Sequence, residues 1–337
     1  MKKHCFALLA CLLGGCTAFA GCTAQEPELT TVRLNEVVHS IFYAPQYVAM
    51  ELGYFEDEGL NIITDVGQGA DKSMTALLSG SADIALLGTE AGIYVYQEGK
   101  TDGAVPFAQL TQRAGNFLLG RQEDPDFQWS DLAGHSLIGG RSGGMPQMIL
   151  EYILKQNGLD PDTDLEMITN LSFTSTSSAF AAGEGDYTVE FEPVATTLEE
   201  QGKGYIVASL GEGSGYVPYT VYMTTPEYLN AHPDVIQGFT NAIYKAQLWM
   251  QDHSAAEIAA VCQPYFEENT VETLTTIIER YQAQDTWTKT PVFSREGFDL
   301  IQDIMRESGE LTMEVPYDGF VQTSFAEKAV AEISPAS

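Results

Sequence analysis

The sequence predicts an α/β protein of two lobes, each with a mixed, mostly parallel sheet and flanking helices, and a helical C-terminal part. Strand-like apolar segments alternate with helical segments along the chain, which favours parallel sheets covered on both faces. The alternation restarts after a boundary at Asp124-Pro125-Asp126. The 337 residues also exceed a single typical core, so two lobes are expected.

The first 22 residues predict an export signal. Lys2-Lys3 precede an apolar run that ends at Ala20-Gly21-Cys22, which looks like a bacterial lipoprotein signal. We expect removal of residues 1–21, lipid on Cys22 and a polar tether over 23–30. Cys16 is a competing site, disfavoured because cleavage there would expose apolar residues 18–20. An ordinary secretory signal with incidental cysteines stays open, and no other stretch is apolar enough to predict a membrane span.

Charge and cysteine content narrow the function classes. The chain has 16 Lys and Arg against 47 Asp and Glu, which excludes nucleic acid and anionic membrane surfaces as partners. The acidity is typical either of solubility or of a protein that binds a cationic ligand. Cys262 is the single cysteine beyond the leader, so an internal disulfide is impossible. We expect Cys262 to be a small buried hydrophobe, with a nucleophilic role as the alternative.

The segment 39–62 predicts a ligand-facing turn, a helix and a second strand. It follows a first strand that holds Val32 and Leu34, and Ala44-Pro45 fits a helix start. Ligands bind at the carboxyl ends of strands in open sheets of this kind. We therefore expect the loop after the first strand to form a pocket wall, with His39, Ser40, Phe42 and Tyr43 as contacts.

The remaining elements are predicted from periodicity and turn residues. In the first lobe they are strand 60–66, helix 71–78, strand 82–87, helix 90–97 and strands 105–111 and 116–120. In the second they are helix 129–134, strand 136–139, helix 146–157, strand 165–169, helix 176–182, strand 187–191, helix 193–201 and strand 204–210. A strand at 217–223 returns to the first lobe, and from 226 onward the pattern is helical. Lobe 1 is thus 31–122 with 222–337, lobe 2 is 123–221, and the hinge lies near 105–125 and 211–225.

Several short motifs resemble one known family, the solute-binding proteins of ABC importers for sulfonates, taurine, nitrate and thiamine-pyrimidine precursors, which also includes the yeast pyrimidine synthase of thiamine biosynthesis. The motifs are Tyr43-Ala44-Pro45, Gly53-Tyr54-Phe55, Glu58-Gly59-Leu60, the segment 77–84 (LLSGSADI) and Phe191-Glu192-Pro193. The likeness spans about residues 31–330. It implies a type II periplasmic-binding-protein fold and a monomeric extracytoplasmic receptor that delivers its solute to a membrane permease driven by a separate ATPase.

Glycine-rich turns supply further candidate contacts. Arg141, Ser142, Gly143 and Gly144 lie between a strand and a helix, where free N–H groups attract a polar or negative group. No Walker lysine follows, so nucleotide hydrolysis is not expected. A tight turn that merely requires glycine is the alternative.

The equivalent turns of the first lobe place Gly67, Thr89 and Glu90 at the cleft. Thr89 either caps its helix or faces the solute. Gln112 and Arg113 end a strand near the crossing, where the arginine could bind a carboxylate or sulfonate or form an interlobe salt bridge.

The strand end Glu190-Phe191-Glu192 alternates, so both carboxylates should share one face and Phe191 the other. They either face the cleft, where Glu192 could accept from an amino-substituted ring, or are solvated charges. Tyr219 completes the expected set of contacts.

Enzyme chemistry is not predicted, nor is a metal or cofactor. The histidines lack metal-ligand spacing, no Gly-x-Ser-x-Gly motif occurs, and the cysteine-rich motif of the synthase branch is absent. We expect a small nitrogen heterocycle of the thiamine-precursor kind between Phe42, Tyr43 and Phe191. An aliphatic sulfonate, taurine or nitrate is the alternative ligand. Sensing without import is an alternative role, and a secreted enzyme a third.

Overall fold

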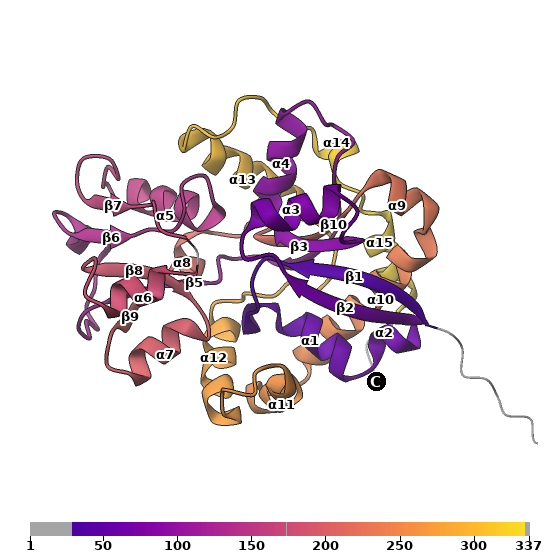
Figure 1. Cartoon of the computed structure of the whole chain (residues 1–337), viewed down its shortest axis with the longest axis horizontal. Coiled ribbons are helices and arrows are strands. Elements are labelled where there is room, and N and C mark those ends of the chain that lie inside the picture. The colour runs from indigo at the N-terminus through magenta and orange to yellow at the C-terminus, as the bar shows by residue number, and fades with distance from the viewer. Residues whose placement is uncertain (1–28, 173, 334–337) are drawn as a thin grey trace, which may run out of the picture.

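The computed structural model describes residues 29–172 and 174–333, which form two lobes side by side (Figure 1). Each lobe is built on one five-stranded sheet with helices on its faces. The strand orders are β2-β1-β3-β10-β4 in sheet A and β7-β6-β8-β5-β9 in sheet B. The predicted α/β fold with mixed sheets is confirmed.

Sheet A forms the core of lobe 1. Its strands are β1 (Thr30–Glu36), β2 (Leu60–Val66), β3 (Ile84–Gly88), β4 (Val105–Thr111) and β10 (Thr220–Thr224). β1 runs parallel to both β2 and β3, whereas β10 is antiparallel to β3 and β4. The carboxyl ends of the three parallel strands therefore meet at the edge that faces lobe 2.

Sheet B forms lobe 2. Its strands are β5 (Asn116–Gly120), β6 (Ser136–Ile138), β7 (Glu166–Ile168), β8 (Tyr187–Phe191) and β9 (Tyr205–Ser209). β6 is parallel to β7 and β8, and β5 is antiparallel to β8 and β9. The sequence places β5 in lobe 1 with a boundary at residue 122. Because β5 pairs in sheet B, the crossing instead precedes residue 116.

The helices that cover the sheets follow the predicted order. Lobe 1 carries η1 (Ile41–Tyr43), α1 (Ala44–Glu51), α2 (Tyr54–Asp57), α3 (Ala70–Leu78) and α4 (Thr89–Gln97). Lobe 2 carries η2 (Trp129–Leu132), α5 (Met145–Gln156), α6 (Thr176–Ala181), α7 (Val194–Glu200) and α8 (Leu210–Gly213). The C-terminal part is α9 (Pro226–Ala231), α10 (Pro233–Gln251), α11 (Ala255–Cys262), η3 (Gln263–Tyr265), α12 (Val271–Ala283), α13 (Arg295–Glu307), α14 (Tyr317–Phe320) and α15 (Ser324–Glu332). Gly53, with a left-handed φ of 73°, separates α1 from α2.

The first crossing between the lobes is braced by Tyr281 of α12 and by Gln284, the residue directly after that helix. The Tyr281 hydroxyl donates to the carbonyl of Gly115 at 2.7 Å, and the Gln284 amide donates to that of Ala114 at 3.0 Å. Within the hinge, Arg113 donates to the carbonyl of Gly211 at 2.9 Å. The C-terminal residues thus brace the first crossing, which Arg113 in turn joins to the second.

Candidate ligand-binding cleft

A cavity of about 280 Å³ lies between the two lobes. Lobe 1 contributes Val37, Val38, Tyr43, Gln68, Gly69, Ala70, Lys72, Gly88, Glu90, Tyr219 and Thr220, and lobe 2 contributes Gly140, Arg141, Gly144, Met145, Pro146, Ser172, Thr176, Val189, Glu190 and Phe191. Most of these residues follow the carboxyl ends of strands or begin helices. The fold therefore brings strand ends from both sheets to one place.

Contacts across the cleft hold the lobes close together. Arg141 of lobe 2 forms a salt bridge of 2.8 Å with Asp71 of α3. The Tyr94 hydroxyl of α4 donates to the carbonyl of Gly143 at 2.9 Å. The Ser40 hydroxyl donates to the carbonyl of Glu192. These bonds define a closed conformation, in which a small solute would be enclosed on both sides.

Glu90 presents a buried carboxyl group from lobe 1. It is the second residue of α4, only 3% of it is exposed, and its Oε2 atom has no hydrogen-bond partner in the described part of the chain. A Cβ atom at Gly88 would lie 1.9 Å from that oxygen, so a side chain there would displace the Glu90 carboxyl from this position. Burial raises the pKa of Glu90 to about 7, although nearby backbone N–H groups oppose the rise.

Glu190 presents a second carboxyl group from lobe 2. It lies on β8 and is 6% exposed. The hydroxyls of Thr188 and Thr176 donate to it at 2.9 and 3.2 Å. Burial raises the pKa of Glu190 to about 7, with the two hydroxyls acting in the opposite direction. Each lobe therefore directs one carboxyl of raised pKa toward the cavity.

Three aromatic side chains form the apolar wall. Tyr43, Phe191 and Tyr219 line the cavity, and the Tyr219 hydroxyl has no partner among the described residues. Phe42 is fully buried behind them, with ring centroids 5.7 Å from those of both Phe191 and Tyr219. The wall thus suits a flat, partly apolar solute that also offers a polar group to Tyr219.

Six of the sequence-predicted contact residues lie at the cavity: Tyr43, Glu90, Arg141, Gly144, Phe191 and Tyr219. The others do not line it. They are His39, Ser40, Phe42, Gly67, Thr89, Gln112, Arg113, Ser142, Gly143 and Glu192. Ser40, Phe42 and Gly143 nevertheless touch the cavity wall or cross the cleft beside it.

Several of the other residues have structural partners. His39 contacts Glu36 and the carbonyl of Tyr265, at 3.0 and 2.7 Å. The Thr89 hydroxyl donates to a backbone carbonyl of the return crossing rather than capping its helix. Gly67 lies where a Cβ would be 2.2 Å from the Ser73 hydroxyl.

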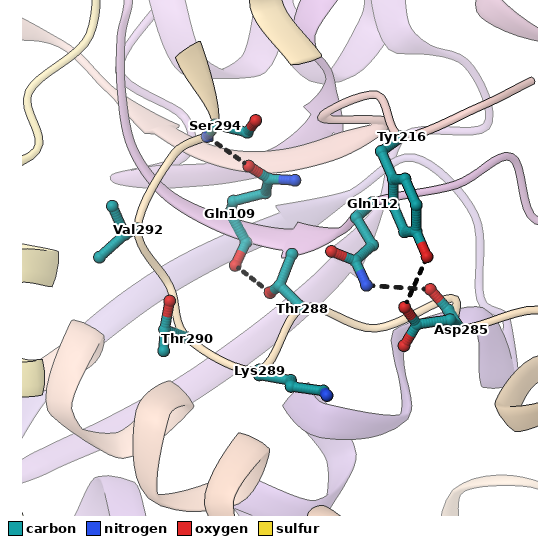
Figure 2. Close-up of a pocket in the computed structure, with 9 residues that line it drawn as sticks. All are labelled: Gln109, Gln112, Tyr216, Asp285, Thr288, Lys289, Thr290, Val292 and Ser294. Atoms are coloured by element: carbon teal, nitrogen blue, oxygen red, sulfur yellow. Dashed lines mark hydrogen bonds between the residues drawn. The ribbon is translucent and has the colours of Figure 1, made fainter. Parts of the chain in front are cut away.

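Gln112 and Arg113 lie at the hinge, away from the cleft. Figure 2 shows Gln112 in a separate, open cavity of about 380 Å³, where its amide donates to the carbonyl of Asp285 at 3.1 Å. Arg113 lies over the ring of Tyr216 at 4.1 Å. Neither residue lines the cleft cavity, and Arg113 bonds a hinge carbonyl in place of the interlobe salt bridge considered for it.

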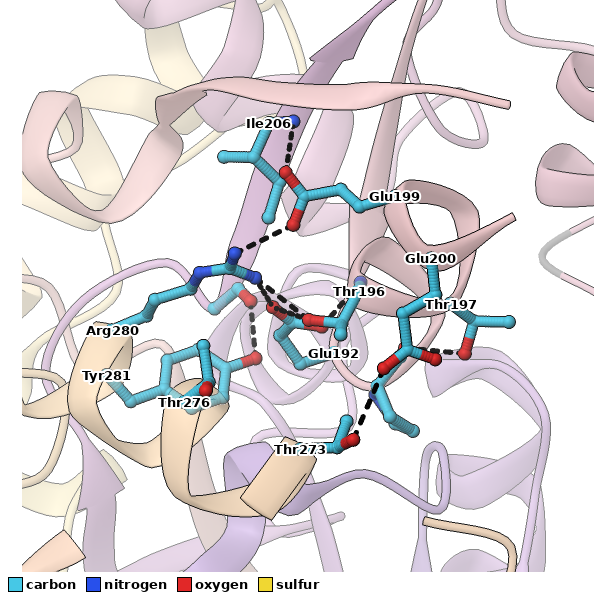
Figure 3. Close-up of polar contacts among 12 residues, drawn as sticks. Glu192, Thr196, Thr197, Glu199, Glu200, Ile206, Thr273, Thr276, Arg280 and Tyr281 are labelled. Carbon is cyan, nitrogen blue, oxygen red and sulfur yellow. Dashed lines mark hydrogen bonds and ion pairs between the residues drawn. The ribbon is translucent and has the colours of Figure 1, made fainter. Parts of the chain in front are cut away.

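Glu192 belongs to an interlobe ion network (Figure 3). Its buried carboxylate accepts from the N–H of Thr196 at 2.9 Å and from Arg280 at 2.9 Å, and Arg280 also bonds Glu199 at 2.7 Å. Glu190 and Glu192 therefore have different surroundings. Period-two alternation applies within a strand, and β8 ends at Phe191.

Fifteen residues that line the cavity were not among the expected contacts, although the position of several of them in the sequence, just after a predicted strand, indicates a binding site. Val37 and Val38 follow β1, Gln68 follows β2, and Gly140 follows β6. The rule that ligands bind beyond the carboxyl ends of parallel strands applies to all of these positions. Thr176 and Val189 had no comparable local signal.

Within residues 29–172 and 174–333, no group of three or more His, Cys, Asp and Glu residues could hold a metal ion. In the same part of the chain, no helix has the length and apolar character needed to span a bilayer. Cys22, the expected lipidation site, lies outside the described residues.

Two mixed sheets that close on a cavity define the class of the fold, that of the periplasmic binding proteins. The structure matches the periplasmic aliphatic sulphonate binding protein SsuA from Escherichia coli with a TM-score of 0.67 and 18% identity, covering 86% of this chain and 97% of that one. It also matches the zinc-bound ligand binding component of an ABC-type import system from Staphylococcus aureus with a TM-score of 0.70 and 18% identity, covering 89% and 99% of the two chains.

Sequence comparison gives the family. The model of the NMT1-like family matches residues 25–263, and the chain belongs to that family. It is 44% identical over 315 residues to YtlA of Bacillus subtilis (strain 168), which is named as a binding protein. The match covers 94% of each protein.

Proposed function

We propose that the protein is the extracytoplasmic solute-binding subunit of an ABC importer. A small organic solute would be captured by closure of the two lobes and delivered to a membrane permease whose ATPase lies on the other side. The observation that carries the proposal is the enclosed interlobe cavity, in which Glu90 Oε2 and the Tyr219 hydroxyl have no partner in the described chain. Buried polar atoms of this kind are normally satisfied, so a bound solute is the natural partner.

The proposal includes attachment to the membrane through lipid on Cys22 and action as a monomer. Lobe 1 would comprise the segments around 31–115 and 220–333, and lobe 2 the segment between them, which supports closure by bending at the two crossings. The similarity to YtlA and to a component of an import system supports a transport role. A receptor that senses the same solute without importing it would need the same cleft.

The ligand proposed is a small nitrogen heterocycle of the thiamine-precursor kind. Tyr43 and Phe191 offer flat apolar surface, and the carboxyls of Glu90 and Glu190 can accept hydrogen bonds from ring amino groups. In this arrangement Glu190, rather than Glu192, takes the polar role. Arg141, Gly144 and Tyr219 would complete the contacts.

A sulfonate, taurine or nitrate is the second candidate. Arg141 and Lys72 both line the cavity, and cationic side chains could hold an anion there. The relatedness to a sulphonate-binding fold at 18% identity supports the architecture but not this ligand.

A thermal-shift panel on the purified protein tests the function. The panel contains pyrimidines, sulfonates, taurine, nitrate, amino acids and flavins. A ligand at about 100 times its Kd is expected to stabilise the protein by roughly 2.7 kcal/mol. Recovery of the ligand unchanged by mass analysis is the outcome expected of a binding protein, and turnover would contradict it. Absence of any stabilising solute would count against the solute-binding role itself.

A further inference from the structure

The cleft contains a buried carboxyl group that belongs to the protein itself, that of Glu90. Glu90 lies in the first turn of α4, where backbone N–H groups have no partner within the helix, and its side chain folds back over Gly88 into the cavity. The start of α5 faces the same carboxyl, since the N–H of Met145 is among the groups that favour its charged form. N–H groups at helix starts are where anions bind.

We infer that the Glu90 carboxylate occupies the position that a bound anion would take, so that the cleft selects a planar cation or a neutral hydrogen-bond donor and rejects anions. This inference rests on the proposed solute-binding function and deepens it. It also places the sulfonate and nitrate class second for a physical reason, because a second anion between the same two helix starts would meet an uncompensated buried charge.

The solvent exposure of the charged groups around the cavity supports this selection. Glu90 is 3% exposed and Glu190 6%, so both carboxyls are shielded from solvent. The cationic residues that line the cavity are in contact with solvent: Lys72 is exposed, and the Arg141 side chain is 47% exposed and already paired with Asp71. The charged groups of the cavity that are shielded from solvent are therefore carboxyls, whereas the cationic groups are screened by water or by a carboxylate partner.

The polar atoms of the cavity that lack a hydrogen-bond partner also favour a ligand that donates hydrogen bonds. Glu90 Oε2 can only accept a hydrogen bond while it is ionised; the N–H groups of Glu90, Ala91 and Met145 lie near the carboxyl, but no described residue makes a well-formed hydrogen bond to this oxygen. An amidinium, or an amino group on a heterocycle, supplies such a donor, whereas a sulfonate or nitrate supplies none. The nearby Tyr219 hydroxyl can then donate to a ring nitrogen of the same solute.

Three near-isosteric probes separate charge from shape: benzamidinium, benzamide and benzoate. Calorimetric titrations of the full chain would be run in dilute phosphate at about pH 8, above the pKa of about 7 for both carboxyls. Benzamidinium is expected to bind about ten-fold more tightly than benzoate, with benzamide between them. In Glu90→Gln the preference for benzamidinium over benzoate should shrink, with the Glu190 carboxylate maintaining the remainder. Glu98→Gln, the same charge change at the exposed end of α4, should leave it unaltered.

The pH dependence of probe binding tests the same inference with the wild-type protein alone. Lowering the pH to about 5.5 protonates both carboxyls, so benzamidinium should weaken about ten-fold and benzoate should gain. The other titratable groups that line the cavity are Lys72, Arg141, Tyr43 and Tyr219, and Asp71 lies beside it as the partner of Arg141. The pKa of Asp71 is lowered by Arg141, that of Arg141 is raised by Asp71, and burial raises the pKa of both tyrosines, so these four groups keep their charge state over this range.

Equal affinity of the wild type for benzamidinium and benzoate, including no binding of either, would overturn the inference, as would an undiminished preference for benzamidinium in a folded Glu90→Gln. The proposed function fails separately. If the thermal-shift panel identifies a sulfonate as the tight ligand, import of a solute stands and charge selection falls. If the probe order holds but no panel solute stabilises the protein, charge selection stands without a demonstrated solute.

Discussion

Two carboxyl groups, Glu90 and Glu190, dominate the chemistry of the cavity at the scale of single residues. Both are ionisable groups held in an apolar setting, and for both burial raises the pKa from 4.5 to about 7. Their side chains come from different lobes, so their environment depends on how closely the lobes approach. The cavity is therefore sensitive to pH and to lobe closure through the same two residues.

The stability of the ligand-free protein should fall as pH rises from about 4.5 to 7 through these two groups. Between those values the folded state binds more protons than the unfolded state, because each folded pKa is raised. Each shift corresponds to roughly 3 kcal/mol at full effect. Urea denaturation of Glu90→Gln is thus expected to show a gain over the wild type at pH 8 that is absent near pH 4.5. An identical pH slope for variant and wild type would contradict the raised pKa of Glu90, and Glu98→Gln is the matched control.

The interlobe ion network acts at the scale of secondary-structure elements. Arg280 lies on α12, which packs on α11 and η1 of lobe 1, and it reaches Glu192 and Glu199 beside and on α7 of lobe 2. The Glu192 side chain is fully buried, so its charge depends on this partner. The network joins the C-terminal helices to the residue that follows Phe191 of the cavity wall.

Arg280→Met should destabilise the protein by about 3 kcal/mol, because Glu192 would remain as an unpaired buried charge. Replacing both partners, as in Glu192→Gln with Arg280→Met, should cost less than the sum of the two single changes. Denaturation midpoints of the four proteins measure this coupling. Strict additivity would show that the network contributes little.

Glu192→Gln should change affinity for a cleft ligand far less than Glu190→Gln does, because Glu192 does not line the cavity.

The order and type of the elements could be predicted from local sequence, but several contacts could not. Gln112 and Arg113 end a strand, as expected, yet the carbonyls of Asp285 and Gly211 bind them. Those carbonyls come from segments about 100 residues or more away, and hydrophobic periodicity carries no information about such pairs. Glu192 was misplaced relative to Glu190 because strand alternation was extended past the end of β8.

Lobe closure is the event expected at the scale of the whole molecule. Three contacts bridge the cleft, through Asp71, Tyr94 and Ser40 of lobe 1. The Asp71 pair is about half exposed on both sides, so it contributes at most about 1 kcal/mol and is weakened by salt. A bond of this strength permits opening on the side of α3, whereas the buried Arg280 network joins the two lobes on the side of α12. A ligand in the cleft would shift the balance between open and closed states.

A tight ligand should therefore reduce the radius of gyration in small-angle X-ray scattering, because it shifts an open population toward the closed form. Arg141→Gln removes one bridging contact and should enlarge the ligand-free molecule while ligand still compacts it. Glu98→Gln provides a control with an unchanged profile. An identical scattering curve with and without a saturating ligand would contradict closure on the solute.

The interleaving of the two sheets along the chain has a consequence for how the protein acquires its fold. Sheet B is complete within one continuous stretch, from Asn116 to Ser209, whereas β3 and β4 of sheet A are joined only through β10. The pairing of Thr220 with Gly88 spans more than a hundred residues, and long-range pairings of this kind form slowly. During synthesis from the amino end, lobe 2 can therefore fold before lobe 1 is complete, because β3 and β4 remain unpaired with each other until β10 is available. β10, the return strand beside the cleft, then joins them.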